Sequence, residues 1–136
     1  MTSGPCPWAQ PLNSRRRISR LKSGTDLINE SKARIREIDA TDAVNNPEPD
    51  TVYFDCREPN EYALAHIPGA VFLPRGNLET KIEALIPRDK KILIYCASGN
   101  RSALAADTMQ QMGYTDVASM ARGFKGWVDA GGEVEF

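Results

Sequence analysis

Short segments rich in β-branched and aromatic residues alternate with helix-like segments along most of this chain. The clearest strand candidates are residues 51–55, 90–95 and 117–120, and two further ones are 34–38 and 70–73. Helical spacing and capping residues mark the segments between them. Strands that alternate with helices through short loops fold as a parallel sheet with helices on both faces. The pattern therefore predicts an α/β domain, whose ligands bind at the carboxyl ends of the strands.

The size and charge of the chain restrict its number of domains and the kinds of partner it can bind. Its 136 residues suit one domain with a single core. The formal net charge is -1, so the chain as a whole has no strong field to attract nucleic acid or a membrane surface. No apolar run approaches the roughly 20 residues of a membrane-spanning helix. We therefore expect a cytoplasmic protein with no nucleic-acid partner and no membrane partner.

The start of the chain differs from the remainder in composition. Several prolines break any helix there, and Arg15–Arg17 form a basic cluster. We expect residues 1–24 to be a flexible basic arm and residues 25–136 to be the folded domain. A solvated tail is the favoured interpretation of the cluster, and an anionic partner or a targeting role is the alternative. Thr25 or Asp26 is the expected N-cap of the first helix.

The cysteines and the histidine indicate whether the chain has disulfides or a metal site. Cys6, Cys56 and Cys96 are odd in number and have no paired spacing, which is typical of free thiols in a reducing compartment. His66 is the only histidine and no Cys-x-x-Cys motif occurs, so we expect no metal site.

One of these cysteines lies at the end of a buried strand candidate. Cys96 directly follows residues 90–95 and starts the loop that leads into a predicted helix over 101–112. The first N–H groups of a helix have no partner within it, and with the helix dipole they favour negative charge. This position lowers the pKa of a thiol and offers a cradle for an anion. A packing role is the alternative, but the polar loop favours covalent chemistry with Cys96 as the nucleophile.

Three motifs together resemble one known family, the rhodanese (thiosulfate sulfurtransferase) family. The similarity extends over about residues 35–135, and three motifs in the right order are far more specific than any one alone. The motifs are residues 55–62 continuing through 66–70, the loop 96–102, and Arg122-Gly123-Phe124 with Trp127 and Gly131.

The resemblance implies both a fold and a reaction. The fold would be a doubly wound, rhodanese-like domain around a central five-stranded parallel sheet flanked by helices. Cys96 would carry sulfane sulfur as a persulfide, from thiosulfate or a persulfide donor to cyanide or a thiol, with no cofactor. Thioredoxin or a sulfur-carrier protein would be further candidate partners. Arg101 would bind an anionic donor. The substrate-binding backbone N–H groups would be those of Ala97, Ser98, Gly99, Asn100 and Arg101.

Other side chains are expected to support the site. Asp55, Arg57 and Glu61 are interpreted as an ion-pair network that fixes the loops, with an acid/base set as the alternative. For Cys56, packing behind the strand is favoured over a second redox thiol. His66 is expected to bond to backbone groups rather than to act as a base.

Three positions depart from the family pattern. Ala65 stands where glycine usually precedes the histidine, and Cys56 replaces an aliphatic residue. We expect these two to affect only packing. Arg122 stands where a second glycine often precedes Gly123, and we expect it to reshape the pocket rim and so bear on acceptor choice.

Two other functions remain open at this point. The first is a cysteine phosphatase or arsenate reductase, whose loop has five residues between cysteine and arginine. Here four residues separate Cys96 from Arg101, and Tyr95 replaces the histidine that often precedes the phosphatase cysteine. The second is a rhodanese-like regulatory or binding module. Such modules often lack the cysteine, which this chain keeps.

Overall fold

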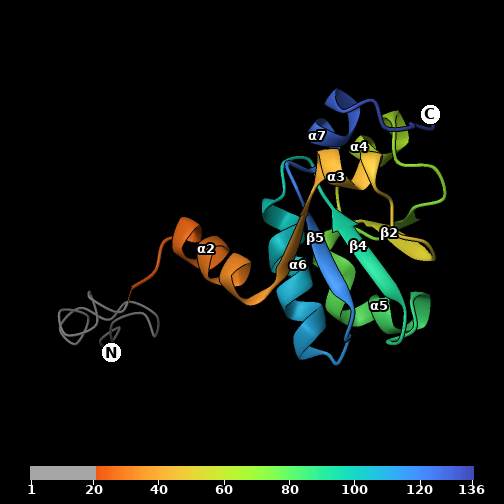
Figure 1. Cartoon of the computed structure of the whole chain (residues 1–136). Helices are drawn as coiled ribbons and strands as arrows, with labels where there is room; N and C mark the ends of the chain where they lie inside the picture. Colours follow the sequence, from red (N-terminus) through yellow and green to blue (C-terminus); the bar gives the residue numbers. More distant parts are fainter. Residues whose placement is uncertain (1–20) are drawn as a thin grey trace, which may run out of the picture.

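A single parallel sheet organises the protein. The computed structural model describes residues 21–136, and in that range five parallel strands pair in the order β1-β5-β4-β2-β3 (Figure 1). The predicted α/β fold with a central five-stranded parallel sheet is confirmed. Of the predicted arm, residues 1–20 lie outside the described part of the chain. The strands are β1 (Arg36–Asp39), β2 (Thr51–Asp55), β3 (Val71–Phe72), β4 (Lys91–Tyr95) and β5 (Val117–Ala121).

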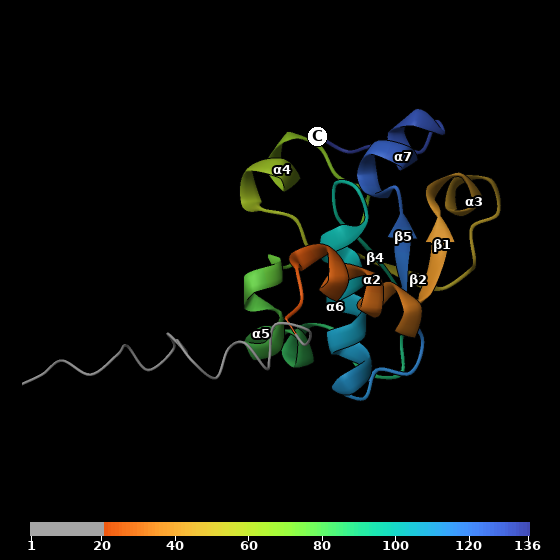
Figure 2. The same cartoon turned by 90° about the vertical axis from the view of Figure 1, so that its left-hand side faces the viewer.

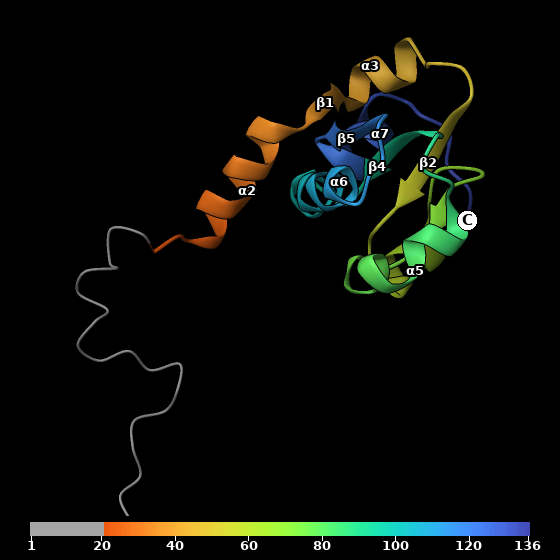
Figure 3. The ribbon, with the colours of Figure 1, turned by 90° about the horizontal axis from the view of Figure 1, so that it is seen from below.

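Helices cover both faces of this sheet (Figures 2 and 3). On one face α5 and α6 pack against the strands, and α2 lies against α6. On the other face α3 and α7 pack against the strands. Among the helices of residues 21–136, none combines the length and the apolar composition needed to cross a membrane. The helices are α2 (Gly24–Arg34), α3 (Ala40–Asn45), α4 (Pro59–Leu64), the short 3-10 helix η2 (Arg75–Asn77), α5 (Leu78–Leu85), α6 (Asn100–Gln111) and α7 (Gly123–Asp129).

The side chains of β4 fill two separate cores. Ile92 and Ile94 point into the core under α5 and α6, while Leu93 and Tyr95 point into the core under α3 and α7. This alternation is the period of two expected of a strand, and both faces are apolar because helices cover both. Cys96 continues the alternation and belongs to the core under α5 and α6.

The carboxyl ends of β2 and β4 lie side by side. Their last paired residues are Asp55 and Tyr95, and the next N–H, that of Cys56, donates to the Tyr95 carbonyl at 3.1 Å. The segments that follow both strands therefore start at the same edge of the sheet, as the sequence predicts for the site.

The first helix begins earlier than predicted. Ser23, rather than Thr25 or Asp26, is the N-cap of α2. Its hydroxyl accepts from the Asp26 N–H at 3.0 Å, and the Asp26 carboxylate accepts from the Ser23 N–H at 2.9 Å. This reciprocal capping box satisfies two N–H groups at the helix start. The last residues of the predicted arm therefore belong to the helix.

The helix α2 is held to α6 by a polar contact. The carboxylate of Asp107 accepts from the Ser31 hydroxyl at 3.0 Å and from the Arg34 guanidinium at 2.6 Å. Asp107 is only 7% exposed. The contact joins α2 to the helix that begins at the Cys96 loop.

Candidate active site

The sulfur of Cys96 lies at the N-terminus of α6. The N-cap of this helix is Gly99, which has no side chain to accept a hydrogen bond. The Cys96 sulfur fills that role, since Sγ accepts from the N–H of Gly99 at 3.1 Å and from the N–H of Ser102 at 3.4 Å. Gly99 has a φ of +103°, in the left-handed region that favours glycine. The loop thus turns back so that the helix N–H groups face the thiol.

These contacts stabilise the thiolate. Burial by itself raises the pKa of Cys96, which is 1% exposed. Hydrogen bonds from the Ser102 hydroxyl and N–H, and from the N–H groups of Gly99 and Ser98, outweigh burial, so that the pKa lies below that of an ordinary thiol. Cys96 is therefore suited to act as a nucleophile.

Ser102 is a site residue that the sequence reasoning did not assign. Its hydroxyl lies 3.5 Å from the Cys96 Sγ and 2.8 Å from the Ser119 Oγ on β5. Both serines are fully buried. The one available signal was its place as the second residue of the helix predicted over 101–112, where N–H groups have no partner within the helix. The Ser119 contact depends on tertiary structure.

The residues from Cys96 to Arg101 divide between the loop itself and the first turn of α6. Asn100 and Arg101 form the start of α6 rather than the loop proper. The carbonyls of Cys96 and Ala97 point away from α6 and accept from the N–H groups of Phe124 and Lys125, at 2.7 and 3.2 Å. The start of α7 therefore fixes the orientation of the loop backbone.

Only glycine fits at the contact between the loop and α7. A Cβ on Gly123 would lie 2.7 Å from the carbonyl carbon of Ala97 and closer still to the Cys96 oxygen. Its φ of +53° is also in the left-handed region. Gly123 thus allows the α7 backbone to approach the cysteine loop.

Glu61 on α4 holds the guanidinium of Arg101. Two hydrogen bonds join them, at 2.9 and 3.1 Å. The bonds from Arg101 lower the pKa of Glu61 to about 2 and raise the pKa of Arg101. The pair is therefore fully ionised at neutral pH, and it links α4 to the start of α6.

Asp55 and Arg57 form a second, buried pair. The Arg57 guanidinium binds the Asp55 carboxylate at 2.8 Å and the Ala65 carbonyl at 2.7 Å. It also stacks over the ring of Phe124 at 4.3 Å, a cation–π contact. The structure thus resolves the predicted network of Asp55, Arg57 and Glu61 into two ion pairs, one under the loops and one beside the cysteine.

His66 makes structural contacts. Its Nδ1 lies 2.9 Å from the Tyr62 carbonyl, and its ring stacks on that of Tyr62 at 3.8 Å between centroids. Its backbone pairs with Glu135 near the carboxyl end of the chain. His66 therefore fixes the turn after α4.

The Arg122 side chain binds residues at the start of α3. Its guanidinium binds the Asp39 carboxylate at 2.9 and 2.7 Å and also contacts the Thr41 hydroxyl. It thereby joins β5 to the start of α3. Its expected effect on the pocket rim and on acceptor choice stays a prediction.

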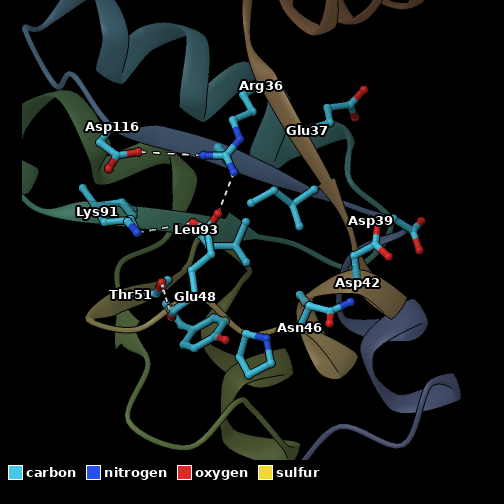
Figure 4. Close-up of a pocket in the computed structure, with 16 residues that line it drawn as sticks. Arg36, Glu37, Asp39, Asp42, Asn46, Glu48, Thr51, Lys91, Leu93 and Asp116 are labelled. Atoms are coloured by element: carbon cyan, nitrogen blue, oxygen red, sulfur yellow. Dashed lines mark hydrogen bonds and ion pairs between the residues drawn. The ribbon is translucent and has the colours of Figure 1, made fainter.

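A pocket of about 330 Å³ lies on the α3 face of the sheet (Figure 4). Its rim carries Arg36, Glu48, Lys91 and Asp116, which pair with one another: Arg36 and Lys91 lie 2.8 and 3.5 Å from Glu48. The Cys96 side chain points into the other core, so this pocket is separate from the cysteine site. Within residues 21–136, no group of three His, Cys, Asp or Glu side chains is arranged to hold a metal ion.

Comparison with known proteins identifies related sequences. The model of the family described as rhodanese-like domain matches residues 39–130. Over 102 residues the chain is 30% identical to a thiosulfate:glutathione sulfurtransferase from Saccharomyces cerevisiae, covering 66% of this chain and 73% of that protein. Two relatives from Bacillus subtilis are 42% and 37% identical over 54% and 60% of this chain, and the matches span 39% and 61% of those relatives' own lengths.

Solved structures with the same architecture are also known. A protein of unknown function from Rhodopseudomonas palustris, described as a possible tyrosine phosphatase, is 37% identical with a TM-score of 0.75, over 84% of this chain and 95% of that one. A rhodanese-related protein from Thermoplasma volcanium is 33% identical with a TM-score of 0.67, over 74% of this chain and 97% of that one.

Proposed function

This chain belongs to the rhodanese-like domain family, and from that premise we propose that it is a sulfurtransferase that carries sulfane sulfur on Cys96. One observation carries the proposal: the Cys96 sulfur accepts hydrogen bonds from the N–H groups of Gly99 and Ser102 at the start of α6. These donors favour the thiolate over the thiol and are fixed by the backbone before any substrate binds.

The proposed reaction has two steps. The Cys96 thiolate attacks the outer sulfur of thiosulfate, forming an S–S bond while the bond to the sulfonate sulfur breaks and sulfite leaves with its electron pair. The product is a Cys96 persulfide anion. Cyanide or a thiolate then attacks the outer sulfur, takes it, and leaves the Cys96 thiolate. The N–H groups that stabilise the thiolate would also stabilise the persulfide anion.

Arg101 is the proposed binding group for an anionic donor. Its guanidinium is only partly buried, with 35% of the side chain exposed, and Glu61 holds it at the start of α6, next to the N–H groups around Cys96. Since Glu61 already neutralises part of its charge, we expect Arg101 to orient the donor more than to attract it from a distance. A persulfide donor with a smaller charge would depend on it less.

The sequence comparisons favour sulfur transfer. The yeast relative is named for transfer between thiosulfate and glutathione, and a 38% identical relative from Pseudoalteromonas translucida is named a thiosulfate sulfurtransferase. Thiosulfate as the donor, and cyanide or a small thiol as the acceptor, are the substrates we propose to test first. Thioredoxin or a sulfur-carrier protein would be the macromolecular acceptors.

The alternative function is phosphate-ester or arsenate chemistry. The Rhodopseudomonas relative is described as a possible tyrosine phosphatase. The loop argues against it in this chain. Four residues separate Cys96 from Arg101, and the guanidinium of Arg101 is bound at two points by Glu61. A tetrahedral phosphate would need a wider loop than these four residues form.

A transfer assay tests the proposal. Wild-type protein is expected to form thiocyanate from thiosulfate and cyanide, and Cys96→Ser is expected to lose all activity while its circular dichroism spectrum is unchanged. Arg101→Ala should raise the KM for thiosulfate with a smaller change in kcat, as expected for a binding contact. The matched control is Arg88→Ala, which removes an exposed arginine bound to Met112 and Glu83. Activity in a folded Cys96→Ser variant, or phosphatase activity in its place, would contradict the proposal.

A further inference from the structure

A second buried thiol lies next to Cys96 and has no part in the proposed transfer. Cys56 is fully buried and belongs to the same core as Cys96. Its Sγ lies 3.5 Å from the carbonyl oxygen of Tyr95, the residue that precedes Cys96. The sequence alone favours a packing role for it, but the strand register gives it a specific neighbour.

Cys56 and Cys96 each directly follow the last paired residue of their strand. β2 and β4 are parallel, and Asp55 pairs with Tyr95 at their ends. The Cys56 N–H continues the ladder by donating to the Tyr95 carbonyl, so the two cysteines take up the next position on each strand. Neighbouring strands lie about 4.8 Å apart, within the range of Cα separations that a disulfide spans. Both side chains also point to the same face of the sheet.

The two thiols differ in their chemical state. The helix N–H groups lower the pKa of Cys96. Burial, together with the nearby Cys96 charge, raises the pKa of Cys56 far above that of an ordinary thiol. At neutral pH one thiolate and one protonated thiol therefore stand side by side. Such a pair suits a reactive cysteine and a partner that stays unreactive until the first is oxidised.

We propose that Cys56 is the resolving thiol of Cys96, and that the two form a reversible disulfide after oxidation by a hydroperoxide. In the first step the Cys96 thiolate attacks an oxygen of the hydroperoxide. A sulfur–oxygen bond forms, the O–O bond breaks, and hydroxide or alkoxide leaves, giving Cys96 sulfenic acid. In the second step the Cys56 sulfur attacks Cys96 Sγ and gives up its proton, so that the disulfide forms and water leaves. Two thiols are oxidised and one peroxide is reduced.

The disulfide would turn the transfer site off and protect it. The Cys96 sulfur would turn from the N–H groups of Gly99 and Ser102 toward β2, so no thiolate would remain for sulfur transfer. Sulfenic acid that finds no thiol is oxidised further to sulfinic and sulfonic acids, which thiols do not reduce. Cys56 would therefore make the oxidation reversible by a cellular dithiol. The proposal needs only the Cys96 thiolate and does not depend on sulfur transfer being the function.

Intact mass spectrometry after hydrogen peroxide treatment tests this inference. All proteins would carry Cys6→Ser, so that Cys56 and Cys96 are the only thiols. Protein with both thiols is expected to lose about 2 Da, to yield a crosslinked peptide pair containing Cys56 and Cys96, and to return to its starting mass with dithiothreitol. The Cys56→Ser variant is expected to gain about 32 or 48 Da at Cys96, and dithiothreitol should not reverse the gain.

Two further measurements keep the test decisive. Cys56→Ala serves if the serine hydroxyl disturbs the buried site, and peptide mapping of the protein with both thiols needs no Cys56 variant. If that protein accumulates sulfinic or sulfonic acid at Cys96 without a crosslinked peptide, the inference is wrong. It is equally wrong if a folded Cys56 variant recovers from peroxide as completely as the protein that keeps Cys56.

Discussion

At the scale of single residues, the cysteine site depends on one buried chain of contacts. The Cys96 sulfur accepts hydrogen bonds from the N–H groups of Gly99 and Ser102. The Ser102 hydroxyl in turn forms a hydrogen bond with the Ser119 hydroxyl in the sheet. No charged side chain touches the sulfur directly among these contacts. Neutral donors fixed by the fold therefore account for the lowered pKa, while the Glu61–Arg101 pair serves the proposed binding of the donor.

Ser102→Ala is expected to raise the pKa of Cys96. The thiolate loses a hydrogen bond that the thiol needs less, so the pKa of Cys96 should rise toward that of an ordinary thiol. Activity depends on the thiolate, which forms as pH rises, so the midpoint of the pH–rate profile should move to higher pH. The measurement is kcat/KM for thiosulfate over a pH range of about 5 to 10.

Ser119→Ala is the control for that variant, because it breaks the same serine pair but leaves the Ser102 hydroxyl next to the sulfur. Its midpoint should move less than that of Ser102→Ala. Equal shifts, or no shift in either variant, would mean that the Ser102 hydroxyl does not stabilise the thiolate.

At the scale of secondary-structure elements, α7 fixes the backbone of the loop that leads from Cys96 into α6. The N–H groups of Phe124 and Lys125 hold the carbonyls of Cys96 and Ala97. Gly123 permits the close approach, since any Cβ there would collide with the loop backbone. The geometry around the sulfur thus depends on a helix that is distant in sequence.

Gly123→Ala is expected to damage both stability and activity. The collision and the left-handed φ should together cost about 2–4 kcal/mol of unfolding free energy. The matched control is Gly131→Ala, whose φ is +85° but whose Cβ would meet no atom within 4 Å. That control should lose only the conformational part, about 1 kcal/mol, and keep its activity. Urea unfolding and the transfer assay measure the two effects, and similar losses in both variants would contradict the packing argument.

The sequence predicts elements better than it predicts contacts. β2 agrees with the predicted residues 51–55, and β4 and β5 differ from the predicted strands by one residue at one end. The signal in β2 and β4 is their β-branched and aromatic residues, which strands favour. The cap of α2 was misplaced to Thr25 or Asp26 because the predicted arm took in Ser23, the actual cap. Several polar residues in succession made the choice ambiguous.

The site could be predicted only as far as local pattern reaches. The position of Cys96 after β4 and before α6 follows from the strand and helix patterns. The partnership of Ser102 with Ser119, and the division of Asp55, Arg57 and Glu61 into two pairs, depend on which strands become neighbours. Strand order is a property of the whole fold, so the sequence pattern carries no direct signal for these contacts.

At the scale of the whole molecule, residues 21–136 contain both cores and every contact of the cysteine site described above. The sheet brings the ends of β2 and β4 together, and helices on both faces bury the strands. The α2 helix is attached to α6 through Asp107. We therefore expect the domain from α2 onward to fold around Cys96 by itself.

Deletion of residues 1–20 is expected to leave sulfur transfer unchanged. The proposed site residues all lie between Asp55 and Ser102, and the capping residue Ser23 is retained. The kcat and KM for thiosulfate should agree with those of the full chain within about twofold, well under the tenfold that 1.4 kcal/mol would produce. A folded deletion variant with lost activity would instead assign the basic arm a functional role.

The most direct measurement is the intact mass of the reduced full chain before thiosulfate, after thiosulfate, and after subsequent cyanide. The account predicts a gain of about 32 Da, one sulfur atom, located on Cys96, and its complete removal by cyanide. Cys96→Ser should show no gain. If the folded wild-type protein with a free Cys96 thiol acquires no sulfur from thiosulfate or from a glutathione persulfide, the central claim of a Cys96 persulfide is contradicted.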